Sequence, residues 1–288
     1  MTLLASFVAG AVVTLSLLHL ARQDILASPL LTRVNYRGRN VPTAIGVTIV
    51  LALFCVEVAR VLLRSSGVGP DTFTAETGIT PDRLLVLAVA AGFGLVGLLD
   101  DVIGAEDRRG FKEHIGSLLH GRLTTGGIKI IGGGAVALFA SAAVNEGNAV
   151  QTLADGALIA LCANLGNLFD RAPGRTIKVA LLAYLPMAIM AGGNTIGVAM
   201  APLMGAAVGL LPADLKERIM LGDAGANVLG GALGFMAVRE CNEGVQAGVL
   251  VAAILLNLAA ERWSFSKIIS KTPPLRFLDM LGRDKVDS

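Results

Sequence analysis

The sequence predicts an all-α, polytopic bundle of membrane-spanning helices. Of its 288 residues, 54% are hydrophobic and only 16% are charged, and the mean hydropathy is +0.69. Soluble domains carry roughly 25% charged residues, so this composition excludes an ordinary soluble protein. The apolar residues form long runs, many of them near the roughly 20 residues that a helix needs to cross a bilayer. Glycine at 35 positions indicates that these helices pack closely.

Nine apolar runs predict nine spanning helices in a single membrane domain, 1–288, with 261–288 as a polar tail. No basic segment precedes the first run and no clear cleavage site follows it, so we expect a retained helix and not a signal peptide. The expected helices are 3–21, 43–63, 83–99, 128–145, 150–166, 177–192, 195–212, 225–238 and 244–260.

The distribution of basic residues predicts the orientation. With the N-terminus outside and the C-terminus cytoplasmic, all but four of the 24 Lys and Arg residues fall on the cytoplasmic side. Cytoplasmic loops of membrane proteins carry such an excess. Four acids at helix ends then share this side, and they place the expected active site there: Asp100, Asp101, Asp170 and Asp223.

The uncharged run 84–99 ends in two adjacent carboxylates, Asp100 and Asp101. Adjacent carboxylates repel each other, so they favour a divalent cation or a cationic neighbour. Lys129 enters the next helix and offers an anion site beside this cation site. The pattern predicts a Mg²⁺-dependent active site at this edge of the membrane.

A second polar group follows the fifth helix. Asn164, Asn167 and Asp170 are three residues apart, so they share one helix face. Such side chains are costly in a membrane helix unless they pair or bind a ligand. The alternative to a binding site is an interhelical hydrogen-bond cluster. The turn at 173–174 is surrounded by basic residues, namely Arg171, Arg175 and Lys178.

Asp223 lies between small residues in the segment Gly222-Asp223-Ala224-Gly225. It is either an N-cap of the eighth helix or a ligand of Mg²⁺, which takes one or two carboxylates together with waters and substrate phosphates. With three other acids expected on the same side, we favour the metal ligand.

Two further groups of basic residues are candidate phosphate contacts. Arg37 and Arg39 precede the second helix, where they form either a phosphate clamp or a plain positive-inside loop. Lys271 and Arg276 follow the last helix, and they either reach toward a diphosphate or belong to a tail that lies on anionic lipid.

At these residues, from about Asn35 to Arg276, the chain resembles the polyprenyl-phosphate N-acetylhexosamine-1-phosphate transferase superfamily. Five segments carry the resemblance in the family's order: Val41-Pro42-Thr43, Leu98-Leu99-Asp100-Asp101, Leu123-Thr124 with Lys129, Asn167-Leu168-Phe169-Asp170 and Gly222-Asp223-Ala224-Gly225. Each is weak alone, and together on one membrane face they are specific. Two departures concern donor recognition: Arg171 replaces a common glycine, and 271–276 replaces a histidine-rich motif.

The resemblance implies transfer of a sugar-1-phosphate from a UDP-sugar to membrane polyprenyl phosphate, with release of UMP, in cell-envelope polymer synthesis. Asp223 is implied as the main Mg²⁺ ligand, supported by Asp101, with Mn²⁺ as an alternative metal. Asp100 is implied as the base or positioner of the lipid phosphate, and Lys129 as a phosphate contact. Asn167 and Asp170 are implied to bind the donor or a metal-bridged phosphate. No nucleic-acid partner is expected.

Two other functions remain open at this point. A non-catalytic relative would bind polyprenyl phosphate without turnover. A transporter would use Asp155, the pair Glu57 and Arg60, and the asparagines as a polar path, although such groups are expected near the middle of the membrane. Small-residue pairs either tighten the bundle or form a homodimer face; they are Gly193 with Gly197, Gly205 with Gly209, and Gly230 with Gly234.

Overall fold

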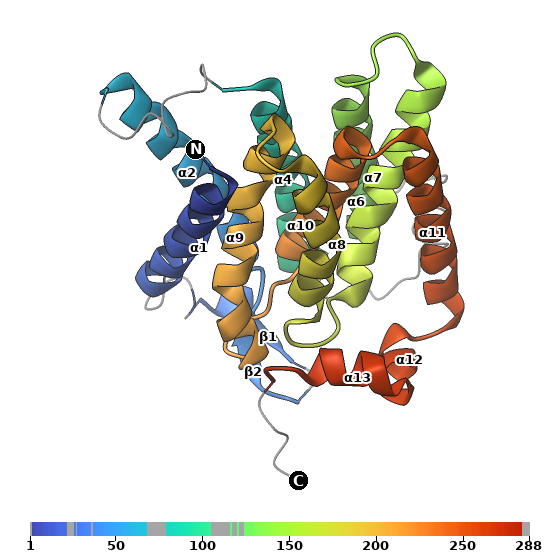
Figure 1. Ribbon diagram of the computed structural model, residues 1–288. Helices are drawn as coiled ribbons and strands as arrows, with labels where there is room; N and C mark the ends of the chain where they lie inside the picture. The colour runs from blue at the N-terminus through green and yellow to red at the C-terminus, as the bar shows by residue number, and fades with distance from the viewer. Residues whose placement is uncertain are drawn as a thin grey trace.

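A computed structural model gives the structure of the protein, and it shows the expected helical membrane bundle (Figure 1). It describes residues 2–21, 26, 28–35, 37–67, 79–104, 116, 120 and 124–283. The helices are α1 Leu3–Leu20, α2 Val47–Ser65, α4 Pro81–Ile103, α6 Thr125–Ala142, α7 Ala149–Phe169, α8 Arg175–Ala191, α9 Thr195–Leu215, α10 Asp223–Glu240, α11 Glu243–Arg262, α12 Phe265–Lys271 and α13 Pro273–Met280.

Each of the nine expected helices is present, and the bounds differ from the expected ones by a few residues. Among the described residues, six helices are long and apolar enough to cross a membrane, namely α1, α4, α6, α7, α9 and α11. Helix α8 has only 17 residues, and α2 and α10 each carry three charged residues. The protein is therefore a multi-pass membrane protein, whereas nine spans and their orientation stay predictions.

The helices begin where the sequence supplies polar N-caps. Thr124 accepts a hydrogen bond from the backbone N–H of Gly127 at 3.0 Å, and Asn194 accepts one from Gly197 at 2.9 Å. Such side chains satisfy backbone donors that have no partner within the helix. The first residue of each of these helices is therefore set by a local polar cap, which the apolar runs alone do not locate.

The segment before α2 contains a small hairpin that the all-α prediction does not include. Strand β1 Thr32–Val34 pairs antiparallel with β2 Asn40–Pro42, after a 3₁₀ turn at Pro29–Leu31. The backbone N–H of Met220 donates to the Pro42 carbonyl at 2.7 Å. This hydrogen bond joins the hairpin to the segment that leads into α10.

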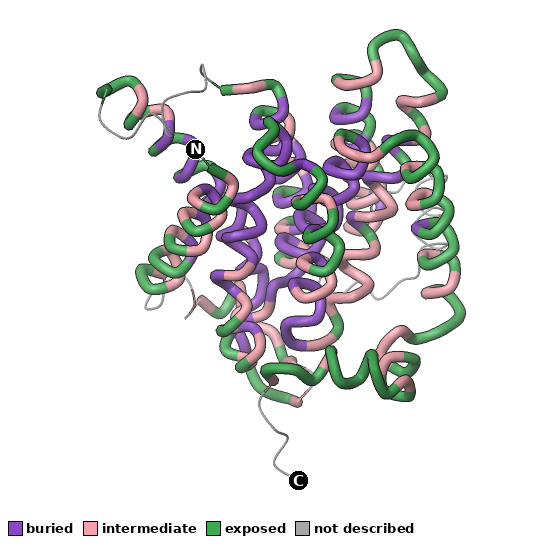
Figure 2. Tube along the Cα trace, in the orientation of Figure 1, coloured by how far each residue is buried: buried purple, intermediate pink, exposed green. Residues whose placement is uncertain are grey.

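Burial divides the bundle into a central part and an edge. Fifteen of the 18 residues of α10 are buried, whereas α11 buries only Ala253 among its 20. Figure 2 shows the buried trace concentrated on α4, α9 and α10. Helix α11 lies at one side of the bundle, and α12 and α13 continue from it along one end (Figure 1).

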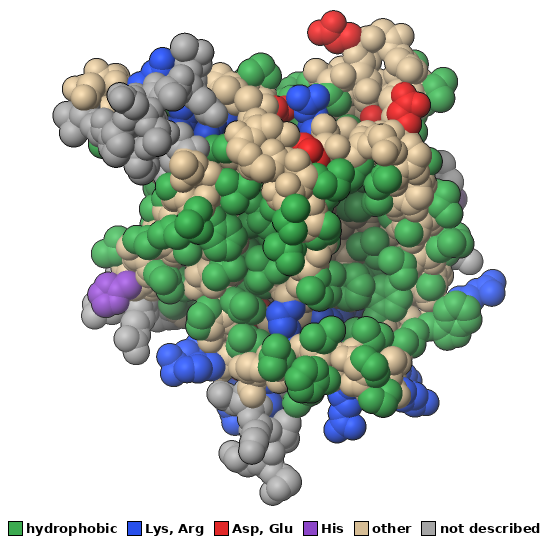
Figure 3. Space-filling view, in the orientation of Figure 1, with side chains coloured by type: hydrophobic (Ala, Val, Ile, Leu, Met, Phe, Trp, Pro, Cys, Tyr) green, Lys and Arg blue, Asp and Glu red, His purple; other side chains and the backbone are tan. Residues whose placement is uncertain are grey.

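Charge separates along the bundle axis. In Figure 3 a hydrophobic belt covers the middle of the visible face, and Lys and Arg side chains gather at the end that carries the hairpin, α12 and α13. A basic end beside a hydrophobic belt is the pattern that the positive-inside rule assigns to the cytoplasm.

Two of the glycine pairs pack helices together within the chain. A Cβ atom at Gly205 would lie 1.8 Å from the carbonyl oxygen of Phe7 in α1, and one at Gly230 would lie 2.1 Å from the carbonyl oxygen of Cys162 in α7. Only glycine lets backbones approach this closely. These positions therefore tighten the bundle, and a homodimer stays a prediction.

Candidate active site

The end of α4 and the start of α10 are held in contact by Gly97. A Cβ atom at this position would lie 2.3 Å from the carbonyl oxygen of Asp223, so only glycine permits the approach. Asp100 is three residues further along α4, on the same side of the helix. The close packing therefore places the acidic pair beside Asp223.

Asp101 acts as an N-cap of α10 from a different helix. Its Oδ1 accepts the backbone N–H of Asp223 at 3.1 Å, and its Oδ2 accepts that of Ala224 at 2.9 Å. Gly222 has a φ of 70°, and a Cβ atom there would lie 2.6 Å from Asp101 Oδ2. Glycine is thus required twice, for its backbone conformation and for this contact. Asp101 keeps unused oxygen lone pairs, and its role as a metal ligand stays a prediction.

Four predicted residues, one of them Lys129, meet at the end of the bundle. The Nζ atom of Lys129 contacts Asp223 Oδ2 in a very short ion pair and lies 3.5 Å from Asp100 Oδ2. Asn167 Nδ2 donates to the same Asp223 oxygen at 2.9 Å. The four side chains come from α4, α6, α7 and α10, so the structure unites motifs that are far apart in the sequence. We call this set the acidic cluster.

Asp170 follows the last residue of α7 and adjoins the acidic cluster. Its Oδ1 accepts a hydrogen bond from Thr176 Oγ1 at 3.3 Å. Desolvation, followed by the nearby carboxylates of Asp214 and Asp223, raises the pKa of Asp170 well above its ordinary value. A cationic ligand or a bound metal ion would favour its charged form.

Two cavities border these residues. The larger, about 670 Å³, has Asp100 and Lys129 in its lining and continues between apolar side chains of α4, α6, α7 and α11, including Phe93, Val96, Leu161, Ile254 and Leu258. We call it the apolar groove. The smaller, about 360 Å³, is lined by Asp170, Arg171, Asp214, Glu217 and residues of the hairpin. We call it the polar cavity. The acidic cluster therefore borders the apolar groove, and its neighbour Asp170 lines the polar cavity.

The hairpin contributes two arginines near the site. Arg37 forms an ion pair with Glu217 at 2.9 Å, and Glu217 lines the polar cavity. Arg33 Nη2 donates to the backbone carbonyl of Asp101 at 3.1 Å. The first contact places Arg37 beside the polar cavity, and the second fixes the end of α4.

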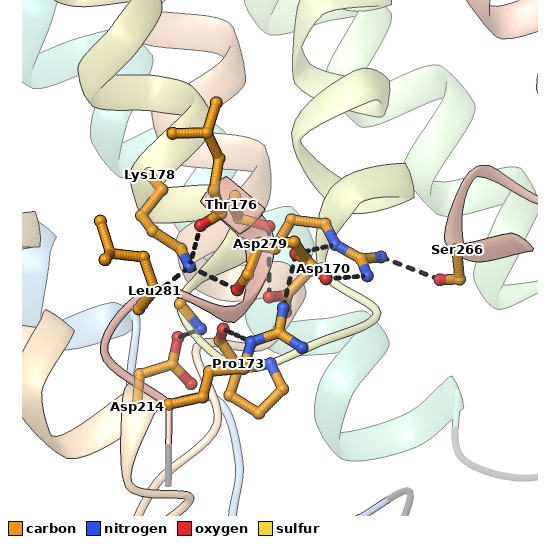
Figure 4. A network of polar contacts seen from close by, with 12 residues as sticks. Asp170, Pro173, Thr176, Lys178, Asp214, Ser266, Asp279 and Leu281 are labelled. Atoms are coloured by element: carbon orange, nitrogen blue, oxygen red, sulfur yellow. Dashed lines mark hydrogen bonds and ion pairs between the residues drawn. The ribbon is translucent and has the colours of Figure 1, made fainter. Parts of the chain in front are cut away.

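Arg175 does not join the acidic cluster. Its Nε and Nη2 donate to the two carboxylate oxygens of Asp279 in α13 at 2.8 and 3.0 Å, and Nη1 donates to Ser266 at 2.8 Å (Figure 4). Lys178 Nζ donates to the Asp279 carbonyl oxygen at 2.6 Å. Arg175 therefore anchors the C-terminal helices, which carry Lys271 and Arg276 as exposed side chains.

Other polar groups lie at the opposite end of the bundle. The expected pair of Glu57 with Arg60 is present at 2.9 Å, and Arg83 also binds Glu57. Asp155 accepts hydrogen bonds from Asn145 at 2.7 Å and from Gln151 at 2.9 Å. These groups bind one another at the far ends of α4 and α7, so no described residue of this set extends a polar path from the acidic cluster.

The donor set of the acidic cluster fits a magnesium ion. The described residues include no group of three or more His, Cys, Asp or Glu side chains arranged to hold a metal. Mg²⁺ does not need one, because it is usually bound by one or two carboxylates, with waters and substrate phosphates as the other ligands. Asp100 and Asp223 supply two such carboxylates, and Lys129 is the cation that neutralises them here.

Several site residues were not singled out by sequence reasoning. Gly97 carries a usable signal, since a small residue one turn before a site acid indicates close backbone approach, as the small residues around Asp223 already did. Asn227, a lone amide in an apolar helix four residues after Asp223, carries one too. Asp214, which accepts the Gly174 N–H at 2.9 Å, and Arg33 act between distant segments and have no local signal.

Two curated relatives align with the chain, and both are named phospho-N-acetylmuramoyl-pentapeptide-transferase. The protein of Shouchella clausii is 25% identical over 264 residues, which cover 86% of this chain and 78% of the relative. That of Desulforudis audaxviator is 31% identical over 180 residues, which cover 56% of this chain and 54% of the relative. No family model matches the chain.

These alignments confirm the resemblance found in the motifs. The chain is related to the polyprenyl-phosphate hexosamine-1-phosphate transferase superfamily. The acidic cluster is formed by four residues of the segments that carry this resemblance, Asp100, Lys129, Asn167 and Asp223. Their roles in catalysis stay predictions.

Proposed function

We propose that the protein transfers a sugar-1-phosphate from a UDP-sugar to a membrane polyprenyl phosphate, in cell-envelope polymer synthesis at the cytoplasmic face. One observation carries this proposal: the acidic cluster borders an apolar groove of about 670 Å³. A ligand that fits both has a phosphate at one end and a long hydrocarbon chain. Polyprenyl phosphate is such a molecule.

The polar cavity suits the nucleotide part of the donor. Asp170, Asp214 and Glu217 offer oxygen acceptors for ribose and base donors, and Arg171 is exposed beside them as a cation for phosphate. Because Asp170 also adjoins the acidic cluster, a donor in the polar cavity would bring its diphosphate toward Asp223. Donor and acceptor would then meet between the two compartments.

The reaction requires one bond to form and one to break. An oxygen of the lipid phosphate attacks the phosphorus that carries the sugar, and the oxygen that joins the two donor phosphates leaves with UMP. Such transfers depend on in-line positioning and charge neutralisation more than on covalent help. Lys129 would neutralise phosphate charge. Asp100 would orient the lipid phosphate or hold its proton.

Asp223 would be the main ligand of the Mg²⁺ ion, and Asp101, which caps the N-terminus of α10, would support it. A bound Mg²⁺ supplies charge stabilisation for the transferring phosphoryl group. Asn167 fixes the orientation of Asp223 through its hydrogen bond at 2.9 Å. The residues of this chain thus supply binding and orientation on both sides of the reacting phosphates.

The test is UMP release by purified protein in detergent, supplied with undecaprenyl phosphate, Mg²⁺ and a panel of UDP-sugars. We expect release that requires lipid and metal and falls about 100-fold in D223N, because that variant loses a charge at the developing phosphate. D155N is the matched control, since Asp155 is a buried carboxylate at the far end of the bundle. Its turnover should stay near that of the unchanged protein.

Two results would contradict the proposal. Lipid binding without UMP release across the whole panel would identify a non-catalytic relative that binds polyprenyl phosphate. Equal losses in D223N and D155N would show that the acidic cluster has no special part in turnover.

A further inference from the structure

Asn227 is a buried amide whose hydrogen-bonding groups are unused. Asn227 is only 2% exposed, and neither its Nδ2 nor its Oδ1 atom has a hydrogen-bond partner among the described residues. Buried polar side chains are almost always paired, because leaving them without a partner is unfavourable. Asn227 also lines the apolar groove. A ligand in the groove is therefore the natural source of the missing partners.

The position of Asn227 relates it to the acidic cluster. It follows Asp223 by four residues on α10, so the two side chains lie on one helix face about one turn, roughly 5.4 Å, apart. Asp100 and Lys129 line the same groove as Asn227. The unpaired amide thus stands at the junction between the polar end of the groove and its apolar length.

Two other amides that line the groove are already satisfied. Asn164 Nδ2 donates to Asn257 Oδ1 at 2.6 Å, and Asn257 Nδ2 donates to the Ala253 carbonyl at 2.8 Å. The bond between Asn164 and Asn257 joins α7 to α11. It is an interhelical hydrogen bond of the kind that the sequence predicts as the alternative to a binding role for Asn164. Asn227 differs from them because neither its donor nor its acceptor has a partner among the described residues.

We propose that Asn227 binds the phosphate head group of the prenyl phosphate from the groove side and so selects a phosphorylated chain over the free alcohol. This inference rests on the proposed function. Nδ2 would donate to a phosphate oxygen, and Oδ1 would accept from a protonated phosphate oxygen or from a water that the phosphate orders. The hydrocarbon chain offers neither group. Lys129 would hold the same phosphate from the side of the acidic cluster.

The experiment measures binding of geranylgeranyl phosphate and of geranylgeraniol to the purified protein in detergent, by native mass spectrometry. N227L keeps a similar side-chain volume and removes both polar groups. We expect about a tenfold loss of affinity for the phosphate, the size of one hydrogen bond to a charged group, and unchanged affinity for the alcohol. In turnover, KM for the lipid should rise while KM for the UDP-sugar stays constant.

N227D serves as a second variant that preserves shape and polarity. Its carboxylate faces the phosphate, so the loss for the phosphate should exceed that of N227L, again with the alcohol unaffected. Equal losses for both lipids, or unchanged phosphate binding in both variants, would show a structural role and overturn the inference. If the unchanged protein bound both lipids equally, the proposed function itself would fail, which is distinguishable from a failure at Asn227 alone.

Discussion

Helices α10 and α11 are neighbours in the sequence and similar in length, yet they are used in opposite ways. Helix α10 is buried on nearly all sides, and it presents its N-terminus to Asp101 and its glycines to other backbones. Helix α11 exposes most of its surface, including Leu255 and Leu258, and contributes one wall of the apolar groove. The comparison indicates a buried helix that fixes the acidic cluster and an exposed helix that borders the apolar groove.

The strongest test of the difference between α10 and α11 is to add one methyl group to each helix. G230A places a Cβ atom 2.1 Å from the Cys162 carbonyl oxygen, whereas no atom lies within 4 Å of a Cβ atom at Gly248 in α11. We expect G230A to destabilise the protein by about 3 kcal/mol through overpacking. G248A should be neutral or stabilise by up to about 1 kcal/mol, because alanine favours a helix interior.

Thermal unfolding in one detergent, followed by circular dichroism, measures both variants. Equal shifts in midpoint would mean that α10 and α11 tolerate crowding alike, which would remove the basis for treating α10 as the helix that fixes the acidic cluster.

The contrast between these helices also marks what the sequence could predict. The apolar runs locate the nine long helices of the described residues, because a helix that faces lipid or the centre of the bundle requires continuous hydrophobicity whatever its neighbours are. The four residues of the acidic cluster were found because charged and amide groups at the end of a membrane helix are costly without a role. Each of these signals is local.

Contacts between distant segments could not be predicted in the same way. Nothing in the segment around Arg175 shows that its partner is Asp279, 104 residues away. The hairpin was missed because strands of three residues leave almost no periodic pattern. The capping of α10 by Asp101 was not predicted, because it depends on how α4 and α10 meet, which only the assembled bundle shows.

The caps of α10 and α11 offer a second test of the comparison. Asp101 caps α10 with two hydrogen bonds inside the bundle, whereas Asn242 caps α11 with a single exposed one from Val245 at 3.0 Å. We expect D101A to cost about 2 kcal/mol and N242A about 0.5 kcal/mol of unfolding free energy. Chemical denaturation in detergent measures both. A larger loss in N242A would reverse the assignment of the two helices.

The smallest effect concerns how the chain beyond α11 is held against the bundle. Burial by itself raises the pKa of Asp279, but the hydrogen bond and charge of Arg175, with Arg283 and Lys178, lower it below its ordinary value. A lowered pKa in the folded state stabilises docking of α13 above the unfolded pKa of roughly 3.9, and this contribution is lost as the pH falls through the folded pKa. Docking should therefore persist at pH 5 and weaken below about pH 4.

D279N removes the charge at every pH but keeps a side chain that can accept a hydrogen bond from Arg175, so we expect it to weaken docking by about 1 kcal/mol at neutral pH. Hydrogen exchange of the amides in 273–280 should accelerate in D279N, with 243–262 unchanged. The dependence on acid should also disappear in the variant. If exchange also accelerated throughout α11, docking of α13 would be shown to stabilise α11. The exposed helix would then depend on its contacts with the C-terminal helices, in contrast to the independence that its exposure suggests.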